Sequence, residues 1–291
     1  MSSSSDVLTS SPSSVDPSAP GTSARQKRHW FDYVAPVLGF AGFIGFWYVM
    51  HYWALENLWD KPRFLITAPH RVVRESFLDT ANLADLLDAL LYTTIVAMMG
   101  LAVAIVVGMT LAICMAQASW IERSAWPYLV AVQAIPILAL VPIIGSIFGF
   151  GRGSRVFVCF LIAVFPIVSN TLFGLLSADR GQHDLFTLRG ASRWIRLRKL
   201  QLPAALPAIF TGFRISAGLS VIGAVVGELF FKRGNKGIGI LMDTYRSRNN
   251  YPLTYGALVL TALLGIAVFV FFGWLGNLVI GRWYESTRKT G

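Results

Sequence analysis

Charged residues are scarce in this chain. Lysine, arginine, aspartate and glutamate make up 14% of its 291 residues, whereas about 25% of an average soluble domain is charged. Hydrophobic residues make up 55%, and several apolar runs reach the ~20 residues that a membrane-crossing helix needs. An ordinary soluble domain is therefore excluded. We predict an all-α polytopic membrane protein, because a chain inside a bilayer must satisfy its backbone hydrogen bonds within its own helices.

The motifs of several enzyme and cofactor classes are also missing. The chain has no G-x-x-x-x-G-K-[ST] loop for ATP phosphates, and no G-x-S-x-G or H-E-x-x-H pattern. Its two cysteines, Cys114 and Cys159, both fall inside apolar runs, and its four histidines are scattered. This pattern argues against a disulfide framework or a metal cluster. We expect no catalytic residue, no metal and no cofactor in this chain.

Basic residues outnumber acidic ones, and the net charge is +10. In a membrane protein such an excess indicates contact with anionic lipid headgroups and with a cytoplasmic partner. No basic and aromatic module typical of nucleic-acid binding is visible. Lysine and arginine are nearly balanced between the two sides of the predicted spans, so the charge rule alone does not orient the chain.

Four segments follow one another along the chain. Residues 1–29 are rich in Ser and Pro and are predicted to be a disordered cytoplasmic N-terminus. Residues 30–85 are predicted to contain a first transmembrane helix over Tyr33–Trp53, uncleaved because no small-residue cleavage site follows, and an external connector. Residues 86–282 hold five further predicted spans, and residues 283–291 a cytoplasmic tail. The five spans are expected over Leu86–Met115, Trp126–Phe150, Arg155–Leu176, Ala204–Phe231 and Tyr255–Ile280.

Small residues and prolines mark two of these spans. Gly100 and Gly108 give the second span a face that lets another helix approach closely. Pro127, Pro136 and Pro142 are expected to bend the third span. Such bends either line a pathway or serve packing only, and the sequence leaves both readings open.

The most distinctive stretch is the basic loop between the fourth and fifth spans, DLFTLRGASRWIRLRKLQLP, at residues 184–203. Two short helices fit it: Asp184 is expected to cap the first, and Gly190 to end it in a left-handed turn. Ser192 is expected to cap the second, which should stop before Pro203. Apolar residues fall between the charges. The pattern predicts an amphipathic knob held at the membrane surface.

This loop resembles the cytoplasmic loop of permease subunits of binding-protein-dependent ABC importers, which reads E-A-A, three residues, Gly, nine residues, Ile-x-Leu-Pro. Gly190, nine residues and then Leu200-Gln201-Leu202-Pro203 match the second half, while E-A-A becomes Asp184-Leu185-Phe186. The turn Phe148-Gly149-Phe150-Gly151 and the run Gly237-Ile238-Gly239 resemble motifs of the nitrate, sulfonate and taurine branch. The resemblance covers residues 64–282. On charge alone the loop would be an ordinary basic connector.

The resemblance implies the type I ABC importer fold, with six transmembrane helices and a cytoplasmic coupling helix between spans four and five. It implies a second, identical permease chain, two ATPase subunits that bind ATP and Mg²⁺, and an extracytoplasmic substrate-binding protein. It places the chain in the bacterial inner membrane with both termini cytoplasmic. The residues implied to contact the ATPase are Asp184, Leu185, Phe186, Leu188, Arg189, Gly190, Ala191, Ser192, Trp194, Leu200, Leu202 and Pro203.

Polar residues inside the spans are the candidates for the translocation pathway: Gln133, Pro136 beside it, Ser169, Asn170, Ser216, Ser220 and Glu228. The alternative for each polar group is a hydrogen bond between helices, typically ~0.6 kcal/mol. Glu228 is expected either to pair with Lys232 or Arg233, or to gate the external mouth. Arg214 lies near the cytoplasmic end of the fifth span, where it could snorkel, and a structural role is preferred for it.

The resulting prediction is a permease subunit that imports a small solute, anionic or heteroaromatic, such as a sulfonate or a taurine-like compound. The alternatives within the same architecture are a pyrimidine vitamin precursor, riboflavin or an aromatic carboxylate. A secondary transporter should show a repeat between its halves, and no clear repeat is found. A membrane-embedded enzyme should show clustered catalytic residues near one face.

Overall fold

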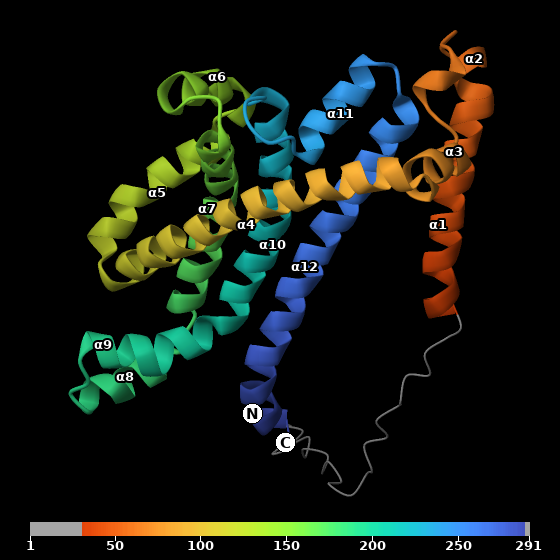
Figure 1. The fold of residues 1–291 in the computed structure, drawn as a ribbon. Helices are drawn as coiled ribbons and strands as arrows, with labels where there is room; N and C mark the ends of the chain where they lie inside the picture. Colours follow the sequence, from red (N-terminus) through yellow and green to blue (C-terminus); the bar gives the residue numbers. More distant parts are fainter. Residues whose placement is uncertain (1–30, 289–291) are drawn as a thin grey trace, which may run out of the picture. The chain divides into compact units, whose positions relative to one another are not determined.

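In a computed structural model, the described part of the chain, residues 31–288, forms helices and no strand (Figure 1). The chain divides into two compact units, residues 1–46 and 47–291. The predicted N-terminal disorder and the end of the tail lie outside the described residues. The helices are α1 Phe31–Val49, α2 Leu55–Asn57, α3 Pro69–Val73, α4 Thr80–Gln117, α5 Ser119–Ala134, α6 Ile137–Phe148, α7 Arg152–Leu176, α8 Arg180–Leu188, α9 Arg193–Arg196, α10 Leu202–Phe230, α11 Ile238–Ser247 and α12 Tyr251–Arg288.

The first unit is described only where it forms α1, from Phe31 to Phe46. The side chains of Phe40, Phe43 and Phe46 are each more than half exposed. A helix that is apolar all round is stable when a bilayer, and not water, surrounds it.

Five helices of the described part are long and apolar enough to cross a membrane, and α5 with α6 makes a sixth if the two count as one broken span. The single bent third span expected from the sequence is therefore divided. Its two halves meet at 99°. Ile135 is extended (φ −70°, ψ 127°) and Pro136 begins the second half, because a residue before proline is disfavoured in the helical region. Pro127 and Pro142 remain inside helices.

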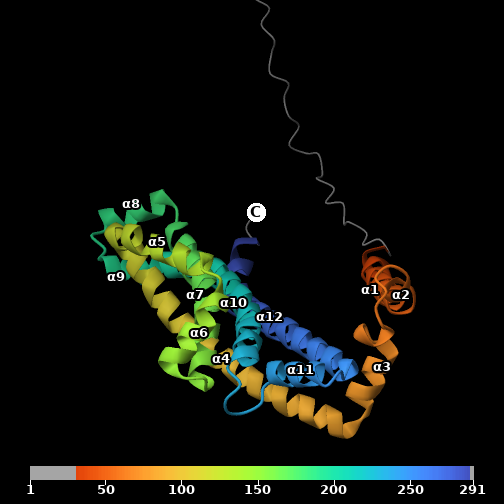
Figure 2. The ribbon, with the colours of Figure 1, turned by 90° about the horizontal axis from the view of Figure 1, so that it is seen from above.

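The core of the second unit is formed where α7 packs between α4 and α10. Figure 2 shows α10 lying between α7 and α12. Two glycines allow α4 and α10 to approach α7 closely on either side of Cys159. A β-carbon on Gly100 of α4 would lie 2.2 Å from the Cys159 β-carbon, and one on Gly223 of α10 would lie 2.9 Å from the Cys159 Cα. The small-residue face expected on the second span is thus confirmed and meets α7. Such faces hold helices together where lipid supplies no hydrophobic drive.

The chain just after the first unit is joined to the second unit's core by polar contacts. The Trp47 indole N–H donates to the Thr67 carbonyl at 3.0 Å, and a ring nitrogen of His51 contacts the Ile66 carbonyl. The Tyr255 hydroxyl of α12 donates to the Leu65 carbonyl at 3.0 Å. The connector 58–68 is therefore held between two helices by its own carbonyl groups.

Candidate functional site

The basic loop starts earlier than expected. Helix α8 is capped by Asp179, whose Oδ1 accepts from the Gly181 N–H at 2.8 Å. Asp184 lies in the middle of α8 and is exposed, so its expected capping role is wrong. The reason is local: Asp179 already satisfies a free N–H group at the start of the helix, and the helix then runs on through Asp184.

The predicted end of this helix is confirmed. Gly190 adopts φ +64°, a left-handed conformation that favours glycine because it has no β-carbon. The Gly190 N–H donates to Thr187 O at 2.9 Å and the Ala191 N–H donates to Phe186 O at 2.9 Å. Together these bonds form a Schellman motif, which satisfies carbonyls at the helix end.

The second short helix is capped as expected but does not stop before Pro203. Ser192 Oγ accepts from the Ile195 N–H at 3.4 Å, and α9 then continues through a π-helical turn, Leu197–Gln201, into α10. The Leu202 N–H donates to Leu197 O, five residues back. The wider turn accommodates Pro203, which cannot donate a hydrogen bond and would clash within a regular α-helical turn. The knob is therefore one end of a continuous helical rod, residues 193–230.

Contacts at the base of the loop hold it against the bundle. Leu197 is buried against Leu175, Ala205 and Ile209, and Leu200 is buried as well. The Gln117 side-chain amide at the end of α4 donates to the Gln201 side chain at 2.9 Å. Arg196 Nη2 donates to Thr187 Oγ1 at 2.9 Å, which ties α9 to α8.

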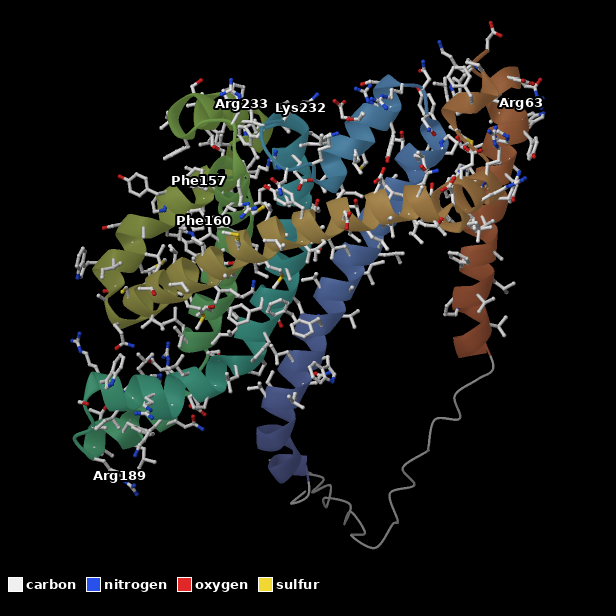
Figure 3. The ribbon with its side chains drawn as sticks, in the orientation of Figure 1. Arg63, Phe157, Phe160, Arg189, Lys232 and Arg233 are labelled. Carbon is white, nitrogen blue, oxygen red and sulfur yellow. The ribbon has the colours of Figure 1, made fainter. Side chains whose placement is uncertain are left out.

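The tip of the loop presents apolar side chains to its surroundings. Leu188 is 86% exposed, Trp194 71% and Leu185 50%. Arg189, at the end of this loop, lies opposite Lys232 and Arg233 at the far end of the bundle (Figure 3). The other expected coupling residues divide: Asp184, Gly190 and Ser192 are exposed, Phe186, Ala191, Leu202 and Pro203 are half-buried, and Leu200 is buried.

The polar pathway candidates also divide between two places. Gln133 of α5 lines a cavity of about 220 Å³ beside Pro166 and Leu219. Ser169 of α7 lines a second cavity of about 520 Å³ between α5 and α7. Pro136 is exposed at the α5–α6 break. Gln133 and Ser169 thus line cavities between α5 and α7.

Asn170, Ser216 and Ser220 line neither cavity. They bond to backbone carbonyls, as Ser169 also does, to Pro166 O at 3.4 Å. The Ser216 hydroxyl of α10 donates to Ala163 O of α7 at 2.7 Å, and Ser220 donates to Ala217 O at 2.8 Å. The Asn170 side-chain amide donates to Pro166 O, one turn earlier in α7, at 2.8 Å. Ser216 and Ser220 are both fully buried within this chain.

Glu228 is fully buried at the α11 end of α10. Its carboxylate accepts from the Thr93 hydroxyl of α4, at 2.9 and 3.0 Å, and from the Gly239 N–H at 2.9 Å. The Ile238 N–H in turn donates to Thr93 Oγ1 at 2.8 Å. The carboxylate therefore sits at the N-terminus of α11, where a negative charge is favourable. Helices α4, α10 and α11 thus meet in one hydrogen-bonded cluster.

The expected pairing of Glu228 with Lys232 or Arg233 is wrong. Lys232 instead donates to Asp243 of α11, and the Arg233 guanidinium lies 6.0 Å from the Phe150 ring centre. The hydrogen bonds from Lys232 and then Arg246 hold the pKa of Asp243 below its ordinary value.

The role of Arg155 was missed by the sequence interpretation, which named this residue as the start of the fourth span. It is fully buried at the start of α7. Its guanidinium donates to the carbonyls of Phe231, at 2.9 and 2.6 Å, of Arg233, at 2.8 Å, and of Asn235, at 3.0 Å. One side chain thus satisfies three carbonyl groups of the loop that connects α10 to α11. No local pattern around Arg155 signals this, because its partners lie 76 to 80 residues away.

Metal ligands do not gather in the described residues, where no group of three or more His, Cys, Asp or Glu side chains is placed to hold an ion. The chain combines several membrane-crossing helices with a capped loop that exposes apolar residues between two of them. This arrangement defines a multi-pass membrane protein.

Comparison with known proteins identifies the family. The family described as the inner membrane component of binding-protein-dependent transport systems matches residues 85–283. The chain is 32% identical over 237 residues, 80% of its length, to the formylaminopyrimidine transport permease of Halalkalibacterium halodurans, covering 91% of that protein. The chain therefore belongs to this family and is an ABC importer permease.

Further relatives differ in the solutes in their names. The riboflavin permease of Chloroflexus aurantiacus is 39% identical over 57% of this chain and 61% of its own length. The nitrate import permease of Synechocystis is 28% identical over 85% of this chain and 89% of its own length. The crystal structure of an amino acid ABC transporter with histidines shares the fold, with a TM-score of 0.54 at 18% identity, and covers 71% of this chain and 98% of its own.

Proposed function

We propose that the loop from Asp179 to Gln201 receives the motion of a separate ATPase and passes it to the spans. The observation that carries this proposal is the set of exposed apolar side chains at the loop tip, Leu185, Leu188 and Trp194. Apolar groups that protrude from a capped and anchored loop are typical of a protein-binding surface. The family supports an ATPase and a substrate-binding protein as partners.

The rod from Arg193 to Phe230 is the means of transmission in this proposal. A helix of this length rises about 57 Å at 1.5 Å per residue. Its loop end is held by the packing of Leu197 and the hydrogen bond of Gln201, and its far end by the hydrogen bonds of Glu228. A push on the loop would therefore tilt the rod as a unit between two arrangements of a pair of permease chains.

The proposed assembly has two copies of this chain, two ATPase subunits that bind ATP and Mg²⁺ on the loop side, and a substrate-binding protein on the α11 side. Both termini and the loop then lie in the cytoplasm of a bacterial cell. The two copies together enclose the path, and Gln133, Pro136 and Ser169 of each are its proposed wall. A packing role is proposed for Ser216, Ser220 and Asn170, since they bond to backbone carbonyls and, unlike Gln133 and Ser169, line neither cavity.

The cargo in this proposal is a small anionic or heteroaromatic solute. Relatives named for formylaminopyrimidine, riboflavin and nitrate support that range, and a taurine-like sulfonate belongs to the same chemical range. Thermal-shift measurements on the substrate-binding protein with taurine, riboflavin, formylaminopyrimidine and an aromatic carboxylate will identify the cargo.

Gly190 offers a direct test of the loop. Any other residue there meets the same left-handed backbone cost, about 1–2 kcal/mol, and a β-carbon at Gly190 has nothing within 4 Å. Gly190→Trp therefore adds bulk at the docking surface, and Gly190→Ala is the matched control with the same backbone cost. In proteoliposomes with the ATPase and the binding protein, we expect the Trp variant to lose coupled uptake by about tenfold or more, which is ~1.4 kcal/mol.

The Ala variant should retain most uptake, and the two variants should have equal thermal stability. Coupled uptake by the Trp variant at the level of the Ala variant would overturn the role of the loop. A pull-down of the ATPase subunit with each variant separates loss of docking from loss of motion. A secondary transporter would bring down no ATPase with any variant.

A further inference from the structure

A positive charge lies deep within the membrane-crossing part of α10. Arg214 is 12 residues from Leu202 and 16 residues from Phe230, which places it about 18 and 24 Å from the two helix ends. The hydrocarbon core is only about 30 Å thick. Arg214 lies near the middle of the candidate span Arg193–Phe230. Its side chain is nevertheless exposed on this chain.

The surroundings of Arg214 hold it in place without neutralising it. Its guanidinium carbon lies 4.2 Å from the ring centre of Phe269 on α12. Gly273, one turn further along α12, leaves room for it: a β-carbon there would lie 3.0 Å from Arg214 Nε. Among the described residues, no carboxylate is within ion-pair distance of Arg214. The other charge within α10, Glu228, is 14 residues or about 21 Å further along the helix.

An arginine in a span is costly when it faces lipid, and intramembrane cations almost always face a bundle interior or a water-filled cavity. The stacking on Phe269 stabilises the cation and leaves the donors at the edge of the guanidinium free for a second group. The adjacent turn of α10 is also open, since a β-carbon on Gly218 has nothing within 4 Å. The guanidinium N–H donors of Arg214 are thus held in a fixed orientation, with free space beside them at Gly218.

We propose that Arg214, backed by Phe269, is an anion-binding site on the transport path, and that it contacts the negatively charged group of the solute. Carboxylate and sulfonate oxygens match the planar guanidinium, which binds such groups through two parallel hydrogen bonds. This inference rests on the proposed function, because it adds the α10–α12 face to a path whose wall is otherwise proposed to be formed by Gln133, Pro136 and Ser169. It narrows the cargo to small organic anions.

The test requires no knowledge of the cargo. A cysteine is placed at Gly218, one helical turn from Arg214, in the permease–ATPase complex in lipid nanodiscs. Two thiol reagents of similar size are compared, the anionic sulfonatoethyl methanethiosulfonate and the cationic trimethylammonioethyl methanethiosulfonate. Mass spectrometry of the permease chain follows their rates at position 218. Cys159 is fully buried and serves as the unreactive internal control.

With Arg214 intact, the anionic reagent should react faster. Arg214→Met should lower the ratio of anionic to cationic rates by about tenfold or more, the scale of electrostatic focusing in a charged cleft. Arg214→Lys, which keeps the charge, should preserve most of the ratio. A second measurement leaves Arg214 in place: millimolar methanesulfonate should slow the anionic reagent and leave the cationic one unchanged.

A cysteine at position 218 that reacts with neither reagent would overturn the proposal, because that face would then lie against lipid or protein. An unchanged ratio in Arg214→Met, or no effect of methanesulfonate, would also overturn it. If Arg214 only joins α10 to α12, its variants will change thermal stability and leave the ratio unaltered. A complex that passes the Gly190 test and fails this one would refute the Arg214 site alone.

Discussion

The cluster at Thr93 gives the sharpest test of how the α11 end is held together. The Thr93 hydroxyl donates to Glu228 and accepts from the Ile238 N–H, and all three residues are fully buried. Thr93→Val replaces the hydroxyl with a methyl of nearly the same volume. The substitution leaves no cavity, so its cost reports the lost hydrogen bonds of the hydroxyl, which also lies 3.0 Å from Ala89 O of the same helix.

The expected magnitude follows from the groups that lose a partner. A buried donor or acceptor left unsatisfied costs about 1–3 kcal/mol, and the substitution affects two such groups. The carboxylate of Glu228 keeps one bond, from Gly239. We therefore expect Thr93→Val to destabilise this end by roughly 2–5 kcal/mol. Thr93→Ser, the matched control, keeps the hydroxyl and loses only one methyl group, about 1 kcal/mol.

Hydrogen exchange measures the effect where it arises. Because 1.4 kcal/mol is a factor of ten in an equilibrium constant, the Ile238 and Gly239 amides should exchange about 30-fold faster or more in the Val variant than in wild type. The Ser variant should stay within about tenfold of wild type on the same scale. Amides in α9, at the other end of the rod, should exchange equally in all three proteins. Equal protection of Ile238 in the Val and Ser variants would refute the reasoning.

Two further predictions concern packing and charge. Gly100→Ala should destabilise the chain by about 1–3 kcal/mol, because its β-carbon would overlap Cys159. Gly218→Ala, whose β-carbon would meet no atom within 4 Å, should leave the stability unchanged. Thermal unfolding compares the two variants, and equal stability would contradict the α4–α7 contact. Asp243 has a lowered pKa in the folded chain because Lys232 and Arg246 donate to it, so its stabilising contribution is present above its unfolded pKa of about 3.9 and is lost as the pH falls through the lower folded value. Asp243→Asn should therefore flatten the loss of stability below about pH 4 and cost no more than about 1 kcal/mol at pH 7; an unchanged acid unfolding curve would count against the pair.

Much of the site could be predicted from local chemistry. Gly190 and Ser192 were found because a left-handed turn and a helix cap each involve bonds across three to five residues, and such bonds leave a mark in the sequence. The spans were found because a bilayer selects long apolar runs. Even local rules had limits. Asp179 and Asp184 were both able to cap a helix, and the earlier one begins α8.

The sequence by itself therefore determined the class of protein, its spans and the loop that defines its family. Only the tertiary structure decided which polar residues are buried, because that depends on contacts between helices far apart in the chain. Thr93 and Glu228 are 135 residues apart, and Arg155 and Phe231 are 76 apart. A charge in a span has the same appearance in the sequence whether it closes a hydrogen-bonded cluster, as Glu228 does, or stands exposed beside an aromatic ring, as Arg214 does. The physical difference is the number of partners that neighbouring helices bring within about 3 Å, and the folded chain alone sets that number.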